Sequence, residues 1–81
     1  MRQVVVMPPF GDASGELVLA HWHKALGERV EKGETLFDVE TEKVTVPVES
    51  VYAGTLTEVL VAEGSSAAEG APIAAIDDGA S

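Results

Sequence analysis

The chain contains no cysteine. It therefore cannot form a disulfide, use a thiol nucleophile or bind zinc through thiolates. It also has no long hydrophobic run: the longest apolar stretches, such as residues 4–7, are far too short to span a bilayer. The N-terminus lacks the basic and then apolar order of a signal peptide. We therefore expect a cytoplasmic protein, or a mitochondrial matrix protein if a targeting segment has been removed. Because the chain has no cysteine, any dithiol chemistry must come from an added group.

Positive charge is scarce as well. Five Lys and Arg residues stand against 14 Asp and Glu residues, which gives a formal net charge of −9. Such an excess of negative charge opposes binding to nucleic acid and to anionic membranes, and it favours a soluble monomer. We therefore expect proteins or small molecules as partners. Lys43 is the only Lys or Arg from Gly33 to Ser81, and it lies within the acidic stretch FDVETEKVTVPVE, residues 37–49.

No segment shows a sustained helical period, whereas short valine-rich stretches are broken every few residues by glycine or proline. This pattern predicts one small all-β sandwich or barrel. A proline within a strand indicates an edge strand, which we expect for Pro47. The residues from Leu17 to Trp22 are apolar on both faces, which predicts a bulge or a strand between core layers. The predicted strands cover residues 3–7, 16–23, 35–40, 44–48, 54–61 and 72–77, with very short ones near Val30 and Ala67.

The chain also repeats itself. A shift of 39 residues places Leu17 on Leu56, and a shift of 37 residues places Leu36 on Ile73. Two similar halves predict quasi-twofold symmetry, in which each half covers an apolar face of the other. The valine-rich pattern stops near the C-terminus, so we expect a folded domain over residues 1–78 and the start of a flexible linker at residues 79–81.

The three residues between the strands predicted at 35–40 and 44–48 indicate an antiparallel hairpin with Lys43 at its tip. Because no glycine or asparagine is present, we predict a type I turn, with Val44 opening the inward face of the second strand. An exposed lysine among acids is commonly a solubilising charge, with ion pairs to its neighbours worth about 0–1 kcal/mol each. The alternative is a primary amine displayed on a rigid turn for acylation by another enzyme.

The residues around Lys43 resemble a known modification sequence. The stretch V-E-T-E-K-V is similar to the lipoylation sequence of lipoyl domains in the acyltransferase components of 2-oxo acid dehydrogenase complexes, E-T-D-K followed by a small or apolar residue. The resemblance covers nearly the whole chain through V-V-M-P, G-E-R-V-E-K-G-E-T-L and A-G-T-L-T-E-V-L-V-A-E-G. The sequence departs from the family pattern at Glu42, where Asp is commoner, at Val51-Tyr52 and in the loop at residues 9–14.

This resemblance implies a flattened barrel-sandwich of two four-stranded antiparallel sheets with quasi-twofold symmetry, with the modified lysine far from the termini. It implies that the loop at residues 9–14 is a second recognition surface beside the turn, and that Gly33 and Gly54 permit sharp bends. The implied site consists of Lys43 as the attachment point for lipoic acid, flanked by the recognition residues Glu40, Thr41, Glu42 and Val44.

The implied protein is a carrier without catalytic activity of its own. Lipoic acid amide-linked to Lys43 would serve as a swinging arm for acyl groups and electrons. The implied partners are a lipoate-attaching enzyme, a thiamine-dependent 2-oxo acid dehydrogenase, an acyltransferase core and a flavin-dependent dihydrolipoamide dehydrogenase.

Three alternatives use the same fold. Biotinyl domains also modify a hairpin lysine, but methionines normally flank it, and Met1 and Met7 are remote from Lys43. A plain interaction module would never be modified, and the glycine-cleavage carrier needs a longer chain. His21 and His23 have a spacing that can chelate a metal, but without a third ligand we predict no metal site.

Overall fold

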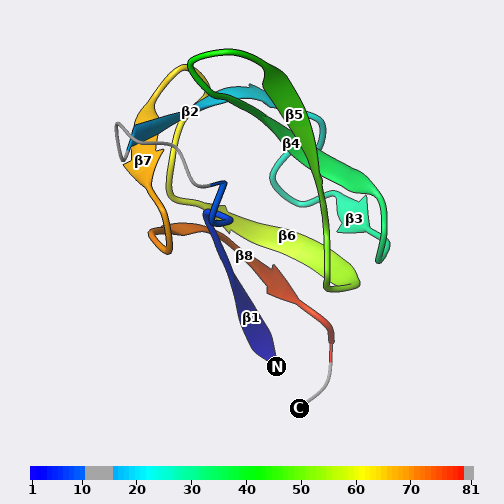
Figure 1. Cartoon of the computed structure of the whole chain (residues 1–81). Coiled ribbons are helices and arrows are strands. Elements are labelled where there is room, and N and C mark those ends of the chain that lie inside the picture. Colours follow the sequence, from blue (N-terminus) through cyan, green and yellow to red (C-terminus); the bar gives the residue numbers. More distant parts are fainter. Residues whose placement is uncertain (11–15, 80–81) are drawn as a thin grey trace.

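The computed structural model describes residues 1–10 and 16–79, and these residues form eight β-strands (Figure 1). No helix occurs in this described part, so none of its segments is a helix able to cross a membrane. The strands are β1 (Arg2–Val6), β2 (Glu16–Trp22), β3 (Arg29–Val30), β4 (Thr35–Glu40), β5 (Thr45–Glu49), β6 (Gly54–Val59), β7 (Ser66–Ala68) and β8 (Pro72–Asp77).

The predicted strands are confirmed, with ends that differ by at most two residues. The bulge expected in β2 lies between Leu19 and His21, where the register against β4 shifts. Pro47 lies in β5, which is an edge strand as predicted. In β5 the valines Val46 and Val48 are half-buried, and their neighbours are exposed, as the alternation indicates.

The strands form two four-stranded antiparallel sheets with orders β1-β8-β6-β3 and β5-β4-β2-β7. The two orders are equivalent: β1, β8, β6 and β3 of the first sheet correspond to β5, β4, β2 and β7 of the second, each four strands away along the chain. The predicted quasi-twofold arrangement is therefore present in the topology itself, and the fold is the flattened barrel-sandwich that the resemblance implied.

The register corrects the repeat, however. Leu19 pairs with Val39 just as Leu56 pairs with Ile76, so β2 maps onto β6 with a shift of 37 and the predicted shift of 39 is wrong. Arg2 pairs with Asp77 as Thr45 pairs with Glu40, so β1 maps onto β5 with a shift of 43. The difference of six between these two shifts arises between β1 and β2: ten residues separate Val6 from Leu17, whereas four separate the equivalent residues Glu49 and Gly54.

Hydrogen bonds outside the ladders follow the same symmetry. The Gly33 N–H donates to Ser50 O at 2.8 Å, and at the equivalent place the Gly70 N–H donates to Met7 O, also at 2.8 Å. Both glycines have positive φ, +90° and +78°, which few other residues adopt without strain. The two halves are thus built from the same turn.

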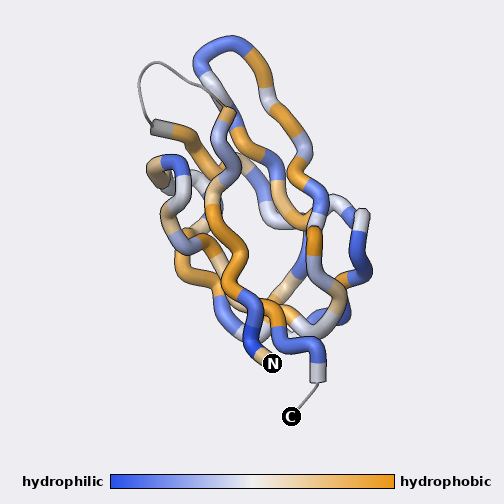
Figure 2. The backbone as a smooth tube through the Cα atoms, turned by 60° about the horizontal axis from the view of Figure 1, so that its bottom comes forward, coloured by the Kyte–Doolittle hydropathy of each residue, from blue (hydrophilic) through white to orange (hydrophobic). Residues whose placement is uncertain are grey.

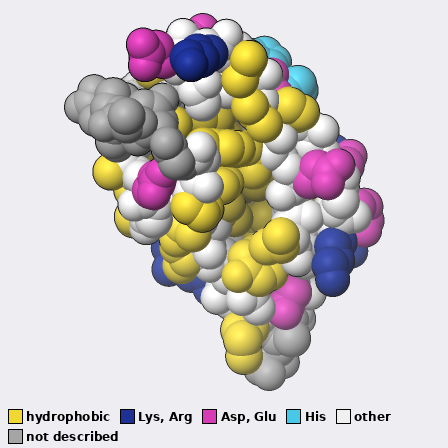
Figure 3. All heavy atoms as spheres, in the orientation of Figure 1, with side chains coloured by type: hydrophobic (Ala, Val, Ile, Leu, Met, Phe, Trp, Pro, Cys, Tyr) yellow, Lys and Arg dark blue, Asp and Glu magenta, His cyan; other side chains and the backbone are white. Residues whose placement is uncertain are grey.

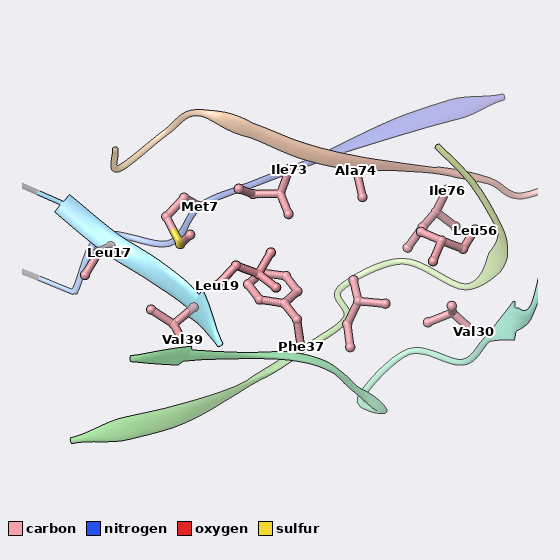
Figure 4. Close-up of a cluster of buried hydrophobic side chains, with 11 residues drawn as sticks. Met7, Leu17, Leu19, Val30, Phe37, Val39, Leu56, Ile73, Ala74 and Ile76 are labelled. Carbon is pink, nitrogen blue, oxygen red and sulfur yellow. The ribbon is translucent and has the colours of Figure 1, made fainter. Parts of the chain in front are cut away.

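The core lies between the two sheets, and both contribute to it (Figure 4). Trp22 packs on Phe37 with 5.2 Å between ring centroids and donates from Nε1 to Val61 O at 3.0 Å. Each fully buried large apolar side chain contributes about 1.5–3 kcal/mol. The completely buried large side chains are Phe37, Met7, Leu17, Leu19, Leu36, Leu56, Ile73, Ile76, Val30 and Val39.

The domain is elongated, with extents of 40 × 19 × 18 Å. The N-terminus and the C-terminal end of β8 lie at one end of the long axis, and the β4–β5 turn lies at the other (Figures 1 and 2). Hydrophilic residues cover this turn, whereas hydrophobic residues dominate the middle of the molecule (Figure 2). The fold therefore places the Lys43 hairpin as far from the termini as the domain allows.

Candidate modification site at the β4–β5 hairpin

The hairpin tip consists of residues 41–44, because Glu40 and Thr45 form the last pair of the β4–β5 ladder. This tip is one residue longer than predicted. Val44 precedes the strand and its side chain is 58% exposed, so the prediction that it opens the inward face is wrong. The physical reason is its place: the ladder ends at the pair of Glu40 and Thr45, so Val44 lies in the tip, and the inward valines of the strand are Val46 and Val48.

The threonine at the base of the tip organises its backbone. The Thr41 N–H donates to Val44 O at 2.8 Å, and the Thr41 hydroxyl donates to the same oxygen at 2.9 Å. Thr41 Oγ1 also accepts from the Val44 N–H at 3.2 Å and from the Lys43 N–H at 3.4 Å. As predicted, the turn needs no positive φ, since only glycines adopt it among the described residues.

Lys43 is exposed at the end of this tip. Within the described part of the chain, its amine lies in no ion pair, although Glu40 and Glu42 are close in sequence. The ion pairs that a merely solubilising lysine would form with these neighbours are absent there. In Figure 3 a basic side chain and an acidic side chain project from the end that carries the β4–β5 turn, above a hollow lined by hydrophobic side chains.

Lys24, two residues after the end of β2, has an amine that is held in an ion pair. Its Nζ lies 2.7 Å from Glu34 Oε2 and its side chain is only 15% exposed. The hydrogen bond that Lys24 donates to Glu34 raises the pKa of Lys24. The same bond, together with a hydrogen bond from the Glu31 N–H, lowers the pKa of Glu34. Arg2 and Arg29 are likewise paired with carboxylates. Among the described residues, Lys43 therefore differs from these three basic residues in that its amine lies in no ion pair.

The structure brings together all five predicted site residues. Glu40 ends β4, Glu42 and Lys43 form the exposed tip, and Val44 leads into β5. What the sequence did not predict is that Thr41, half-buried at the base, acts through its hydroxyl on the backbone. A threonine two residues before the tip of a hairpin that lacks glycine was the available signal.

The predicted second recognition surface, residues 9–14, is described only in part, since residues 11–14 lie outside the described residues. Phe10 shares a groove of about 450 Å³ with Pro47 and Val48, so the start of this loop lies along β5. On the C-terminal side of the loop, Val18 in β2 pairs with Glu40 at the base of the hairpin. Both described flanks of the loop therefore adjoin the two hairpin strands.

The two histidines are occupied by different partners. His21 Nδ1 lies 3.0 Å from Glu63 Oε1, and His23 Nε2 lies 3.0 Å from Asp38 Oδ2. Their rings meet edge-on at 4.9 Å. Over residues 1–10 and 16–79 no three potential ligands are grouped to hold a metal. Each histidine thus pairs with its own carboxylate, and the two do not share a ligand position.

The tip fits covalent attachment of a carboxylic acid cofactor. An amide bond needs an accessible primary amine, and Lys43 supplies one on a turn whose backbone is held by four hydrogen bonds. Neither neighbour of Lys43 is methionine. A chain without cysteine gains dithiol chemistry only through such an added group.

Comparison with known proteins agrees with this geometry. A sequence model of the family described as "Biotin-requiring enzyme" (biotin/lipoyl) matches residues 3–76. The solution structure of the lipoyl domain of the 2-oxoglutarate dehydrogenase complex from Azotobacter vinelandii superposes with a TM-score of 0.79 at 28% identity. The superposition covers 95% of this chain and 98% of that one.

Curated relatives are acyltransferase components. The dihydrolipoyllysine-residue succinyltransferase of the 2-oxoglutarate dehydrogenase complex of Rickettsia conorii is 37% identical over all 81 residues, which span 20% of that protein. The dihydrolipoyllysine-residue acetyltransferase of the pyruvate dehydrogenase complex of Corynebacterium glutamicum is 40% identical over 91% of this chain, and the match covers 11% of that protein. The chain thus spans a fifth or less of these relatives. It belongs to the biotin/lipoyl family, as a non-catalytic lipoyl domain of the kind found in dihydrolipoyllysine-residue acyltransferases.

Proposed function

We propose that Lys43 carries lipoic acid in amide linkage and that the domain presents this arm to the active sites of a 2-oxo acid dehydrogenase complex. The observation that carries the proposal is the exposed amine of Lys43, without an ion pair in the described chain, on a hydrogen-bonded hairpin tip. A bound lipoyl group supplies a disulfide and dithiol couple that accepts electrons and acyl groups.

Attachment changes the local charge. When the amide bond forms between the lipoate carboxyl carbon and Lys43 Nζ, the amine loses its positive charge, and ATP consumed by the attaching enzyme supplies the free energy. Glu40 and Glu42 then leave the tip acidic. We propose that before attachment these carboxylates mark the lysine for the attaching enzyme, and that afterwards they favour docking against basic rims of partner active sites.

The architecture suits presentation rather than catalysis. Two β-strands hold the base of the arm, while the chain ends lie at the opposite end of the long axis (Figure 1). We propose that residues 1–78 act as the carrier unit and that residues 79–81 begin a linker. A tether at that end would raise the effective concentration of the arm at each partner without obstructing the tip.

The partners proposed on this basis are a lipoate-attaching enzyme, a thiamine-dependent 2-oxo acid dehydrogenase, an acyltransferase core and a flavin-dependent dihydrolipoamide dehydrogenase. The relatives named above serve complexes for 2-oxoglutarate and for pyruvate. We propose that the domain works where such complexes do, in the bacterial cytoplasm or the mitochondrial matrix.

The test is covalent loading. Purified domain is incubated with ATP, lipoate and a lipoate–protein ligase, and in parallel with biotin and a biotin–protein ligase, and its intact mass is measured. We expect one lipoyl group per chain and no biotin. Uptake of biotin alone would favour a biotinyl domain, and no gain of mass with either enzyme would favour an unmodified interaction module.

A further inference from the structure

The hairpin tip receives little support from packing. Glu42, Lys43 and Val44 are all exposed, so no side chain of these three is buried in the core. The backbone hydrogen bonds found for residues 41–44 beyond the ladder all involve Thr41. The conformation of the tip therefore depends on one residue at its base.

The Thr41 hydroxyl is used to its full capacity. A hydroxyl has one proton to donate and two lone pairs to accept with. Here the proton goes to Val44 O at 2.9 Å, and the oxygen accepts from the N–H groups of Val44 at 3.2 Å and Lys43 at 3.4 Å. One side chain at the start of the tip thus hydrogen-bonds to Val44 at its end and to the backbone amide of Lys43.

Other turns of the domain are shaped differently. The turns after β3 and β7 contain Gly33 and Gly70, and each of these glycines adopts a positive φ. The tip of the β4–β5 hairpin contains no glycine. A side-chain hydroxyl therefore takes the role that a glycine conformation takes elsewhere in the molecule.

We infer that Thr41 is a positioning residue for the modification of Lys43. Through its hydroxyl it holds the tip in the conformation in which the amine is presented, and it acts on the backbone rather than by touching the attaching enzyme. This inference rests on the proposed function of Lys43. It assigns Thr41 a role different from that of Glu40 and Glu42, whose carboxylates face solvent.

The variant that tests the inference is Thr41→Val, which keeps the branched shape and removes the hydroxyl. If only a fraction of chains holds the competent tip, the apparent affinity for the enzyme falls by that fraction. We expect the KM of a lipoate–protein ligase for the domain to rise about 3- to 10-fold while kcat stays within about twofold. We also expect the NMR order parameters of the Lys43 and Val44 amides to fall from about 0.8 to below about 0.6 in the free domain.

Two further variants serve as controls. Thr41→Ser keeps the hydroxyl and should restore both the KM and the order parameters to near their original values. Thr45→Val makes the same chemical change on an exposed threonine at the start of β5, for which the described structure shows no side-chain hydrogen bond, and should change neither quantity.

The order parameters separate this inference from the proposed function, because they require no modification. If the original domain is not lipoylated, the proposed function fails, whereas loss of order in Thr41→Val would still support the role of the hydroxyl. An unchanged tip in Thr41→Val would overturn the inference. So would a raised KM with an unchanged tip, because Thr41 would then be recognised by direct contact.

Discussion

The β4–β5 hairpin and the β8–β1 end of the domain are equivalent under the quasi-twofold symmetry, yet they end differently. Glu40 pairs with Thr45 as Asp77 pairs with Arg2. Beyond the first pair, four residues close a hairpin, whereas beyond the second the two chain ends approach each other. There the Met1 amine lies 2.6 Å from Asp78 Oδ1, and the Asp78 N–H donates to Met1 O at 3.2 Å.

This difference shows which residues the fold requires. The strands leading to both ends bury equivalent residues: Leu36 and Ile73, and likewise Val39 and Ile76, are all fully buried. The fold thus forms one end without any closing turn. It follows that the residues of the hairpin tip are free to serve function, while those near the chain ends serve mainly stability.

The largest expected effect is the loss of modification in Lys43→Arg. Arginine keeps the charge but offers no amine for the amide bond, so we expect no lipoyl group by intact mass. Because the side chain is exposed, Tm should stay within about 1 °C of that of the original domain. Lys32→Arg is the matched control and should be lipoylated fully. Lipoylation of the Lys43→Arg variant at Lys24 or Lys32 would refute the assignment.

Gly54→Ala, near the chain ends, should do the opposite of Lys43→Arg: it should lower the stability of the domain and leave its modification intact. A Cβ on Gly54 would lie 2.2 Å from Asp77 O, so the backbone of β8 would have to move. We expect a loss of about 2–4 kcal/mol in the free energy of unfolding, measured with urea, while the folded fraction is still lipoylated at Lys43. Gly33→Ala, where space is open and only φ is unfavourable, should lose about 1 kcal/mol. Equal losses in the two variants would contradict the close approach at Gly54.

A smaller effect is expected from Glu34→Gln, because the Lys24–Glu34 ion pair exists in only one half. The equivalent positions in the other half are Val61 and Ala71. The pKa of Glu34 is lowered by Lys24, so its stabilising contribution is complete above the ordinary value of 4.5 and is lost as the pH falls through the folded-state pKa. We expect Tm of the variant to be about 1–3 °C lower at pH 7 and equal to that of the original domain at strongly acidic pH.

The alkaline side gives a second check on this ion pair. Since the pKa of Lys24 is raised, its contribution is complete below 10.5 and is lost as the pH rises through the higher folded-state pKa.

The control for Glu34→Gln is Glu42→Gln. It removes a carboxylate that lies in no ion pair of the described structure and should leave Tm unchanged. A Tm difference that persists in acid for Glu34→Gln would show that the pair is not its source.

The strands and the hairpin could be predicted from the sequence because their signals are local. Alternation in residues 44–48 and the valine-rich segments predict strands, and the gap of three residues before Val44 predicts an antiparallel turn. The family resemblance added the two-sheet arrangement and pointed to Lys43. These features need no knowledge of which residues face one another across the sheets.

What could not be predicted depends on register. Matching Leu17 with Leu56 along the sequence gave a shift of 39. The registers instead relate β2 to β6 by a shift of 37 and β1 to β5 by a shift of 43, because the extra residues lie in a loop. The same uncertainty of one position placed Val44 inside the strand, whereas it lies in the tip beyond the last ladder pair, where the alternation of buried and exposed side chains no longer holds. The hydrogen bonds of Thr41 required the actual length of the tip.

The most direct test of the account is reductive acylation of the lipoylated domain. Domain loaded at Lys43 is mixed with a thiamine-dependent dehydrogenase and its 2-oxo acid, using the enzymes for pyruvate, 2-oxoglutarate and branched-chain substrates in turn, and its intact mass is followed. The account predicts that at least one enzyme adds its acyl group to the loaded domain and none adds it to Lys43→Arg. If all three enzymes acylate free lipoamide but leave the loaded domain unchanged, the domain is not the carrier proposed here.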